Sequence, residues 1–250
     1  MLLRRKRPSP SGEAAAAREV SEGAAWPSPA PGPRLGSAFF GQPCICLAQA
    51  LLGKVLVRRL PGGQELRGRI VETEAYLGGQ DSASHSSGGR RTPRNAAMFM
   101  APGTLYVYQV YGLYFCLNVS SQGEGAAVLL RSLEPLQGLE AMRQQRHLLG
   151  RRKGPAAPLK DWQLCNGPSK LCQALAIDKS LDQEDLACHP AVWLEPGPGA
   201  PGQEPMVCTS RIGISGDWAQ KPLRFYLRGN RCVSVADRRA EEAADHQTPG

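Results

Sequence analysis

The chain has 250 residues, a formal net charge of +8 and a hydrophobic content of 42%. This length and composition predict one domain of about 200 residues with flanking tails. No apolar run of about 18 residues is present to form a membrane-spanning helix. Eight cysteines without a CxxC pair and four histidines without metal-ligand spacing favour reduced thiols and predict neither a metal site nor a cofactor. The basic balance indicates a polyanionic partner.

The first 36 residues differ in composition from the rest of the chain. They are poor in large apolar side chains and rich in Pro, Ala, Gly and Arg, so they cannot bury enough surface to offset the entropy of ordering. We predict a disordered tail over residues 1–36, a folded domain over 37–239 and a short tail over 240–250. The basic cluster Arg4–Arg7 predicts a nuclear protein, with the mitochondrion as a second expectation and a plain solvated tail as the alternative.

From Phe39 onward, short β-type segments alternate with turn residues. Residues 54–77 and 104–120 each predict a β-hairpin. The polar, glycine-rich loop 78–95 between them is long enough to indicate a functional role. The further predicted elements are a strand over 125–135, an amphipathic helix over 136–149 with Leu139, Met142 and Leu149 on one side, a helix over 166–177 with Pro168 in its first turn, a loop over 195–205, and strands over 206–214, 221–229 and 232–237.

These elements together predict the fold class. Strands outnumber helices and follow one another directly, without the βαβ alternation of a doubly wound fold. We therefore expect an α+β protein, a single compact domain with a curved, mostly antiparallel β-sheet surrounded by helices and with a protruding β-hairpin.

Two carboxylates stand close together in the stretch IVETEAYL (Ile70–Leu77). Alternate residues of a strand share a face, so Ile70, Glu72, Glu74 and Tyr76 are expected on one side of the sheet. Like charges crowded on one face are mildly unfavourable, which raises the question of what keeps them there. The residues alone leave Glu72 and Glu74 as equal candidates for a catalytic carboxylate, the other being a structural acid paired with an arginine.

The second hairpin is unusually aromatic, and its apex places Tyr111 directly before Gly112. A large ring at an exposed apex gains little from its own chain, which favours a wedge or stacking role. The nearby basic residues are Arg90, Arg91 and Arg94 in the polar loop and Lys170 at a helix start that could bind phosphate. These features together indicate a nucleic-acid surface that pushes a side chain between bases.

Common catalytic motifs are absent from the chain. It has no GxxxxGK[ST] loop, no GxSxG elbow, no HExxH and no zinc-deaminase cysteine pair, so metal-free, carboxylate-driven hydrolysis remains. Three alternatives stay open. A lyase would need a desolvated lysine, for which Lys54 and Lys170 are the candidates; a damage-binding protein would use the same basic face without turnover; an RNA-binding sheet would need an RNP-type aromatic strand, which is missing.

Long runs of the sequence resemble the alkyladenine (3-methyladenine) DNA glycosylase family of vertebrates. The resemblance extends from about Phe39 to Arg238 through RRLPGGQELRGRIVETEAYL, TPRNAAMFMAPGTLYVYQVYGLYFCLNVSSQG, GPSKLCQALAI and KPLRFY. It implies a monomeric, monofunctional enzyme of base excision repair that flips alkylated or deaminated purines out of double-stranded DNA. The implied substrates are 3-methyladenine, 7-methylguanine, hypoxanthine and ethenoadenine, and the implied product is an abasic site.

The resemblance also implies roles for single residues. Glu74 resembles the general base, and Arg131 and the Ile212 carbonyl resemble the groups that hold the attacking water. The implied base pocket consists of Tyr76, His85 and Tyr108, with Asn118 crowding the purine 2-position, and Tyr111 is the implied intercalating wedge. The implied contacts to the DNA backbone are Thr92, Arg94, Leu113, Ser121 and Lys179. Leu113 departs from a family member that has methionine there, and it keeps the apolar character.

Overall fold

The computed structural model describes residues 33–148, 158–197 and 204–245. Within these ranges the chain forms part of one compact unit that begins at Pro31. The predictions for most of the N-terminal tail, for Leu149 and for much of the proline-rich loop over 195–205 lie outside the described residues.

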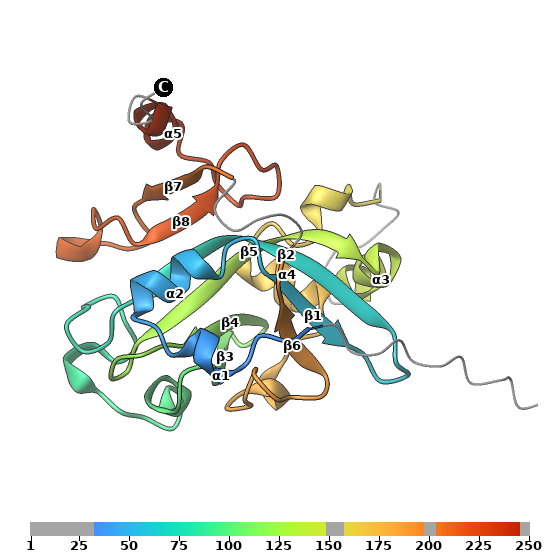
Figure 1. The fold of residues 1–250 in the computed structure, drawn as a ribbon, viewed down its shortest axis with the longest axis horizontal. Coiled ribbons are helices and arrows are strands. Elements are labelled where there is room, and N and C mark those ends of the chain that lie inside the picture. The colour runs from blue at the N-terminus through green and yellow to red at the C-terminus, as the bar shows by residue number, and fades with distance from the viewer. Residues whose placement is uncertain (1–32, 149–157, 198–203, 246–250) are drawn as a thin grey trace, which may run out of the picture. The chain divides into compact units, whose positions relative to one another are not determined.

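An eight-stranded, open β-sheet organises the fold, and all pairs of its strands are antiparallel (Figure 1). The order along the main path is β3-β4-β5-β2-β1-β6, and β8 pairs with β2 and β7. The strands are β1 (Val55–Arg59), β2 (Glu65–Tyr76), β3 (Leu105–Val110), β4 (Tyr114–Ser120), β5 (Ala127–Gln137), β6 (Val192–Glu195), β7 (Met206–Thr209) and β8 (Arg224–Leu227). The predicted α+β class with a mostly antiparallel sheet is confirmed.

The helices are short and lie between these strands in sequence. The α-helices are α1 (Ser37–Phe40), α2 (Cys44–Ala50), α3 (Leu139–Leu148), α4 (Pro168–Ala174) and α5 (Arg238–Asp245), and the 3₁₀ turns are η1 (Ser87–Gly89), η2 (Ala96–Phe99), η3 (Asp161–Gln163), η4 (Lys179–Leu181) and η5 (Gly216–Trp218). The helices predicted over 136–149 and 166–177 are confirmed as α3 and α4, and Pro168 occupies the first turn of α4, where its missing N–H costs nothing. Helix α5 extends past residue 239, where the sequence predicted the folded domain to end.

Strand β2 is long enough to serve different neighbours along its length. Its first half pairs with β1, its second half pairs with β8 on the same edge, and β5 lies along the other edge. The register of β2 against β5 shifts around Glu72, which marks a β-bulge. A bulge inserts one residue and reverses the alternation of faces. The prediction that Ile70 shares a face with Glu74 is therefore wrong: Ile70 packs in the same core cluster as Ala75.

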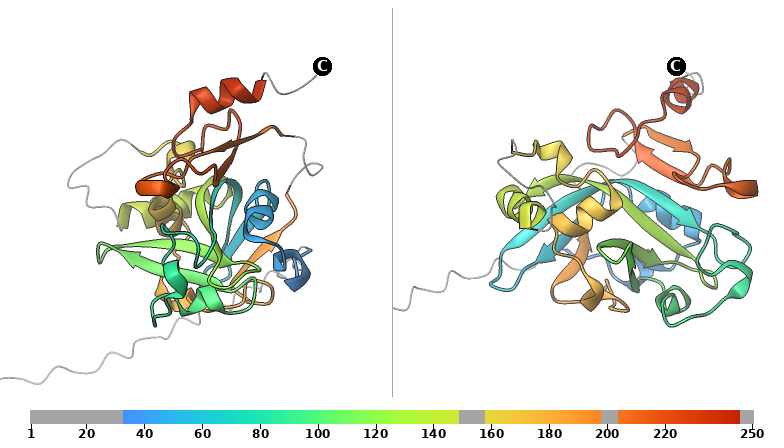
Figure 2. Two further views of the ribbon diagram at one scale, coloured as in Figure 1. Left: turned by 90° about the vertical axis from the view of Figure 1, so that its left-hand side faces the viewer. Right: turned by 180° about the vertical axis from the view of Figure 1, so that it is seen from behind.

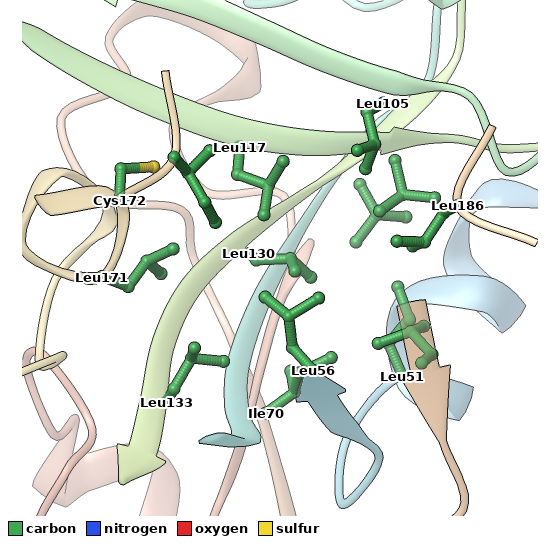
Figure 3. Packing of buried hydrophobic residues seen from close by; sticks show 14 of the residues in the cluster. Leu51, Leu56, Ile70, Leu105, Leu117, Leu130, Leu133, Leu171, Cys172 and Leu186 are labelled. Atoms are coloured by element: carbon green, nitrogen blue, oxygen red, sulfur yellow. The ribbon is translucent and has the colours of Figure 1, made fainter. Parts of the chain in front are cut away.

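The main hydrophobic core lies between the sheet and the helices α2 and α4. Figure 3 shows side chains of α4 and of the central strands pointing towards one another, among them Leu130 and Leu171. Both are fully buried. The long strands β2 and β5 are thereby held rigid, and they carry both acidic residues of the IVETEAYL stretch and Arg131.

A second, smaller core joins Val71 to the C-terminal elements. The elements β7, β8 and α5 lie together at one end of this unit in the views of Figure 2. The strand predicted over 232–237 is wrong, because this segment is irregular. Its N–H groups are satisfied in other ways: Val233 donates to the Asn230 carbonyl, and Ser234 donates to the Glu72 carboxylate at 2.7 Å.

Two further boundaries differ from the sequence prediction. The strand expected over 206–214 ends at Thr209, and the rest is loop. Strand β6 lies where none was predicted, and its last residue, Glu195, is the first residue of the predicted loop. All eight cysteines are free thiols, five of them buried, as expected for reduced cysteines. Within the described ranges, no helix is long and apolar enough to cross a membrane.

Candidate active site

A fully buried pair of carboxylates, Glu72 and Glu74, meets a single arginine at the centre of the sheet. Arg131 on β5 places Nε 3.1 Å from Glu72 Oε1 and Nη1 3.2 Å from Glu74 Oε1. Burial alone would lower the pKa of Arg131, but the charges of Glu74 and then Glu72 outweigh burial and raise this pKa. Arg131 therefore stays charged and offsets the repulsion between the two acids. Arg131, which both acids share, and Arg224, which pairs with Glu72 at 2.9 Å, keep the two carboxylates together in the IVETEAYL stretch.

Glu72 is saturated with structural partners. Besides Arg131, its Oε1 accepts from Arg224 Nη1 at 2.9 Å and from Ser234 Oγ at 2.9 Å. Its Oε2 accepts from Ser132 Oγ at 3.1 Å and from the Ser234 N–H. A carboxylate with five donors around its two oxygens has its acceptor sites filled. Glu72 is thus the structural acid of the two.

Glu74 has fewer partners and is linked to a cavity. Its Oε1 accepts from the Ile212 N–H at 2.8 Å and interacts with Arg131. Its Oε2 accepts from the Tyr76 hydroxyl at 2.9 Å, and no other partner of Oε2 is found among the described residues. Ile212 reaches Glu74 because the chain leaves β7 after Thr209 and continues as a loop. The contact observed for Ile212 is made by its N–H, whereas the family resemblance implies that its carbonyl holds the attacking water.

A cavity of about 200 Å³ lies beside Tyr76. Its lining is formed by Tyr76, Ala83, His85, Met98, Tyr106, Tyr108, Asn118 and Ile214. The four residues assigned to the base pocket from the sequence all lie here. Ala83, Met98, Tyr106 and Ile214 were not expected as lining residues. Ala83, Met98 and Ile214 are small or apolar and carry no sequence signal of their own, whereas Tyr106 lies on β3, on the strand face that it shares with Tyr108. The cavity is aromatic with a few polar groups, which is the usual character of a small-molecule pocket.

His85 is oriented by a tyrosine in the cavity wall. Its Nδ1 lies 2.8 Å from the Tyr106 hydroxyl, and its ring packs edge-on against Tyr108 with 4.7 Å between the ring centroids. Burial and then the charge of Arg94 lower the pKa of His85, which favours the neutral imidazole. Burial raises the pKa of Tyr106 to about 12, so its hydroxyl keeps its proton. The Asn118 amide donates to the Tyr106 carbonyl at 3.1 Å, which fixes its side chain.

The polar loop 78–95 is held by two buried side chains. Asp81 forms a two-pronged ion pair with Arg211, at 2.6 Å and 2.9 Å, and both side chains are fully buried. Asn95 donates to the carbonyls of His85 and Arg90, each at 2.9 Å. These contacts fix the loop that carries His85. Asp81, Asn95 and Arg211 were not predicted as site residues, since the role of each depends on contacts that its own stretch of sequence does not reveal.

The apex of the β3–β4 hairpin presents Tyr111 to solvent. Tyr111 is 93% exposed, and its backbone has a φ of 54°. The Leu113 N–H donates to the Val110 carbonyl across the turn, and Gly112 also has a positive φ. Positive φ values at such turn positions are adopted readily by Gly and Asn and rarely by other residues. A tyrosine there is strained, and it packs against little in its own chain.

The residues assigned to DNA-backbone contact differ in their surroundings. Arg94 and Leu113 are exposed, whereas Ser121 is buried. Thr92 donates to Asn95 through both its N–H and its hydroxyl.

The two lysines of this set are engaged with neighbouring oxygens. Lys179 donates to Asp182 at 2.6 Å and to the Val107 carbonyl. Lys170 donates to the Asn166 side chain at 2.9 Å. Within the described ranges, no group of three or more acidic, histidine or cysteine side chains could hold a metal ion.

A family model of methylpurine-DNA glycosylase matches residues 38–231. Human DNA-3-methyladenine glycosylase is 66% identical over 212 residues, which cover 84% of this chain and 70% of that protein. The mouse enzyme of the same name is 65% identical over 212 residues, covering 84% of this chain and 63% of the mouse protein.

A more distant relative, the probable DNA-3-methyladenine glycosylase of Encephalitozoon cuniculi, is 50% identical over 202 residues, which cover 80% of this chain and 92% of that protein. The chain spans less than two thirds of the length of the mouse relative. The matched region includes the carboxylate pair, the cavity and the exposed hairpin apex. The chain belongs to the methylpurine-DNA glycosylase family.

Proposed function

We propose that this protein is a monofunctional DNA glycosylase of base excision repair that removes alkylated or deaminated purines from double-stranded DNA. Its substrates would include 3-methyladenine, 7-methylguanine, hypoxanthine and ethenoadenine. The observation that carries the proposal is the buried Glu74–Arg131 pair, joined to an aromatic cavity by one hydrogen bond from Tyr76. Family membership supports the same reaction class.

The cavity supplies recognition of a flipped base. Tyr76 and Tyr108 offer ring faces on which a purine can stack, worth about 1–3 kcal/mol per base. This partly offsets the few kcal/mol needed to unstack and unpair the base, a cost that is lowest for damaged bases. His85 offers a hydrogen bond to an edge of the purine. Asn118 crowds the 2-position and disfavours the amino group of guanine.

Glu74 supplies the chemistry. A water held between Glu74, Arg131 and the Ile212 carbonyl attacks the sugar C1′ as the glycosidic bond breaks. Glu74 accepts the proton of that water, and its negative charge stabilises the oxocarbenium-like transition state. The carboxylate is fully buried, which strengthens these electrostatic interactions.

Tyr111 is proposed to enter the DNA stack when the damaged base leaves it. Its exposure and its strained turn are unfavourable for a residue that serves only the fold. Leu113 follows Tyr111 by two positions at the hairpin apex, and the Arg94 guanidinium lies 5.1 Å from the centroid of the Tyr108 ring on β3 of the same hairpin, so both could flank the wedge on the DNA backbone. A monomer is sufficient for this arrangement, because the cavity, the carboxylate and the wedge all come from one chain.

From the basic N-terminal cluster we propose a nuclear location with a mitochondrial fraction.

The alternative lyase chemistry has less support. Among the described residues, no lysine lines the cavity, and Lys170 is hydrogen-bonded to Asn166 away from that lining. Hydrolysis by a carboxylate-activated water leaves no covalent intermediate. A damage-binding protein without turnover would not require a buried Glu–Arg pair at its pocket.

The experiment that tests the proposal uses short duplexes with one 7-methylguanine, hypoxanthine or ethenoadenine. Chromatography should detect the released base, and alkali should cleave the strand at the resulting abasic site. Matched undamaged duplexes are the control. Binding to the damaged duplexes without base release would overturn the proposed activity in favour of a binding protein.

A further inference from the structure

We propose that Arg211, held by Asp81 behind the ring of Tyr76, is a specificity-determining residue that limits the pocket's preference for positively charged purines over neutral ones. This inference rests on the proposed function, because it concerns the base that stacks on Tyr76. It concerns a residue outside the cavity lining and outside the catalytic carboxylate pair.

The position of Arg211 relative to the cavity follows from burial and contacts. Its guanidinium carbon lies 4.5 Å from the centroid of the Tyr76 ring and 5.9 Å from that of Trp218. Its side chain is fully buried, and it does not line the cavity that Tyr76 lines. Arg211 therefore covers the face of Tyr76 that is turned away from the cavity.

A cation on the rear face of an aromatic ring changes what the front face attracts. The face of a ring attracts cations because its π electrons are negative. Arg211 draws these electrons to the rear, and its charge also repels a second cation across the ring. A purine that carries a formal positive charge, such as 7-methylguanine, thus gains less from Tyr76 than it would from an uncovered ring. A neutral purine loses much less.

Asp81 moderates this effect and fixes its geometry. Both terminal nitrogens of Arg211 donate to the Asp81 carboxylate, and Nη1 also donates to the Ala75 carbonyl at 3.0 Å. Asp81 in turn accepts from the N–H groups of Leu77 and Ala83. The Asp81–Arg211 pair is charge-balanced, but it is the Arg211 guanidinium that lies over the Tyr76 ring. A pocket with this backing suits both cationic and neutral lesions.

The test compares single-turnover excision of 7-methylguanine, corrected for spontaneous loss, with that of neutral ethenoadenine in the same duplex. The double variant Arg211→Gln/Asp81→Asn removes both charges and leaves no unpaired buried ion, so it is the variant expected to fold. Its ratio of the 7-methylguanine rate to the ethenoadenine rate should rise about two- to five-fold. Asp81→Asn alone leaves Arg211 uncompensated and should lower the same ratio.

A variant that destabilises the fold without touching the cavity serves as control for effects of stability on the rate ratio. Met142→Ala opens the buried side of α3 and should leave the ratio at the wild-type value. If the double variant slows both substrates by one factor, or if Asp81→Asn raises the ratio, Arg211 is a structural residue and the inference is wrong. Failure of the wild-type protein to excise either base would instead refute the proposed function, which keeps the two failures apart.

Discussion

Replacing Glu72 and Glu74 one at a time by glutamine should separate folding from catalysis. In the Glu72→Gln variant, Arg131 and Arg224 lose a fully buried counter-charge, and the new amide group faces the donors of Ser234. Removing one partner of a buried ion pair costs about 3–5 kcal/mol. For a domain of this size each kcal/mol lowers Tm by about 2–4 °C. Glu72→Gln should therefore lower Tm by roughly 6–20 °C.

Glu74→Gln is the milder change for folding. Its amide oxygen can still accept from the Ile212 N–H and Arg131, and its amide nitrogen can donate to the Tyr76 hydroxyl, which accepts as well as donates. We expect a loss of about 1–2 kcal/mol, the usual scale for weakened charged hydrogen bonds. The excision rate should fall by at least about 10²-fold, because a glutamine cannot accept the proton of the water.

Thermal melting and single-turnover excision of deoxyinosine in a short duplex measure the two effects. Both assays are run at a temperature where each variant is folded. The expected pattern is a large Tm loss with residual excision for Glu72→Gln, and a small Tm loss without excision for Glu74→Gln. The reverse pattern, in which Glu72→Gln abolishes excision at an unchanged Tm, would refute the assignment of the two acids.

Three further predictions concern the apex, the mechanism and the pocket. Tyr111→Asn should relieve the positive-φ strain and raise the free energy of unfolding by about 1 kcal/mol, while weakening the flipping of a paired lesion. Thermal melting measures the first effect and ethenoadenine fluorescence the second. A fall in the free energy of unfolding would instead mark Tyr111 as a residue packed in the fold. Borohydride should trap no protein–DNA adduct and EDTA should leave the rate unchanged, whereas an adduct would indicate a lysine lyase. Arg94→Gln should raise the pKa of His85, observed by NMR titration of its ring proton, because burial and then Arg94 depress this pKa. Because its folded pKa is lowered, a neutral His85 contributes stability that is full above its unfolded pKa of about 6.5 and is lost as the pH falls through the lower folded value.

The hairpins and the position of Tyr111 could be predicted because they depend on local signals. Alternation of apolar residues and the turn residues at Gly112 and at Pro61–Gly63 specify each hairpin without knowledge of the rest of the chain. Tyr111 was identified by its place beside Gly112, and the structure shows it at the exposed apex.

Other features depend on contacts between segments far apart in the sequence. The bulge near Glu72 reverses the face of Ile70, and it has no marker in the stretch IVETEAYL. Glu72 and Glu74 could not be told apart from the residues alone, because the difference is made by Ser234, 162 positions later. Arg211 was missed for the same reason, since its partner Asp81 lies 130 positions earlier.

We expect Glu74 to act on the chemical step only, after the damaged base has entered the aromatic cavity. Stopped-flow fluorescence of a duplex with one ethenoadenine measures both steps in one trace. Wild-type protein should give a fast change for flipping and a slower change for base release. Glu74→Gln should keep the fast phase and lose the slow one; a variant that releases the base at the wild-type rate, or that loses the fast phase while still bound to DNA, would contradict the account.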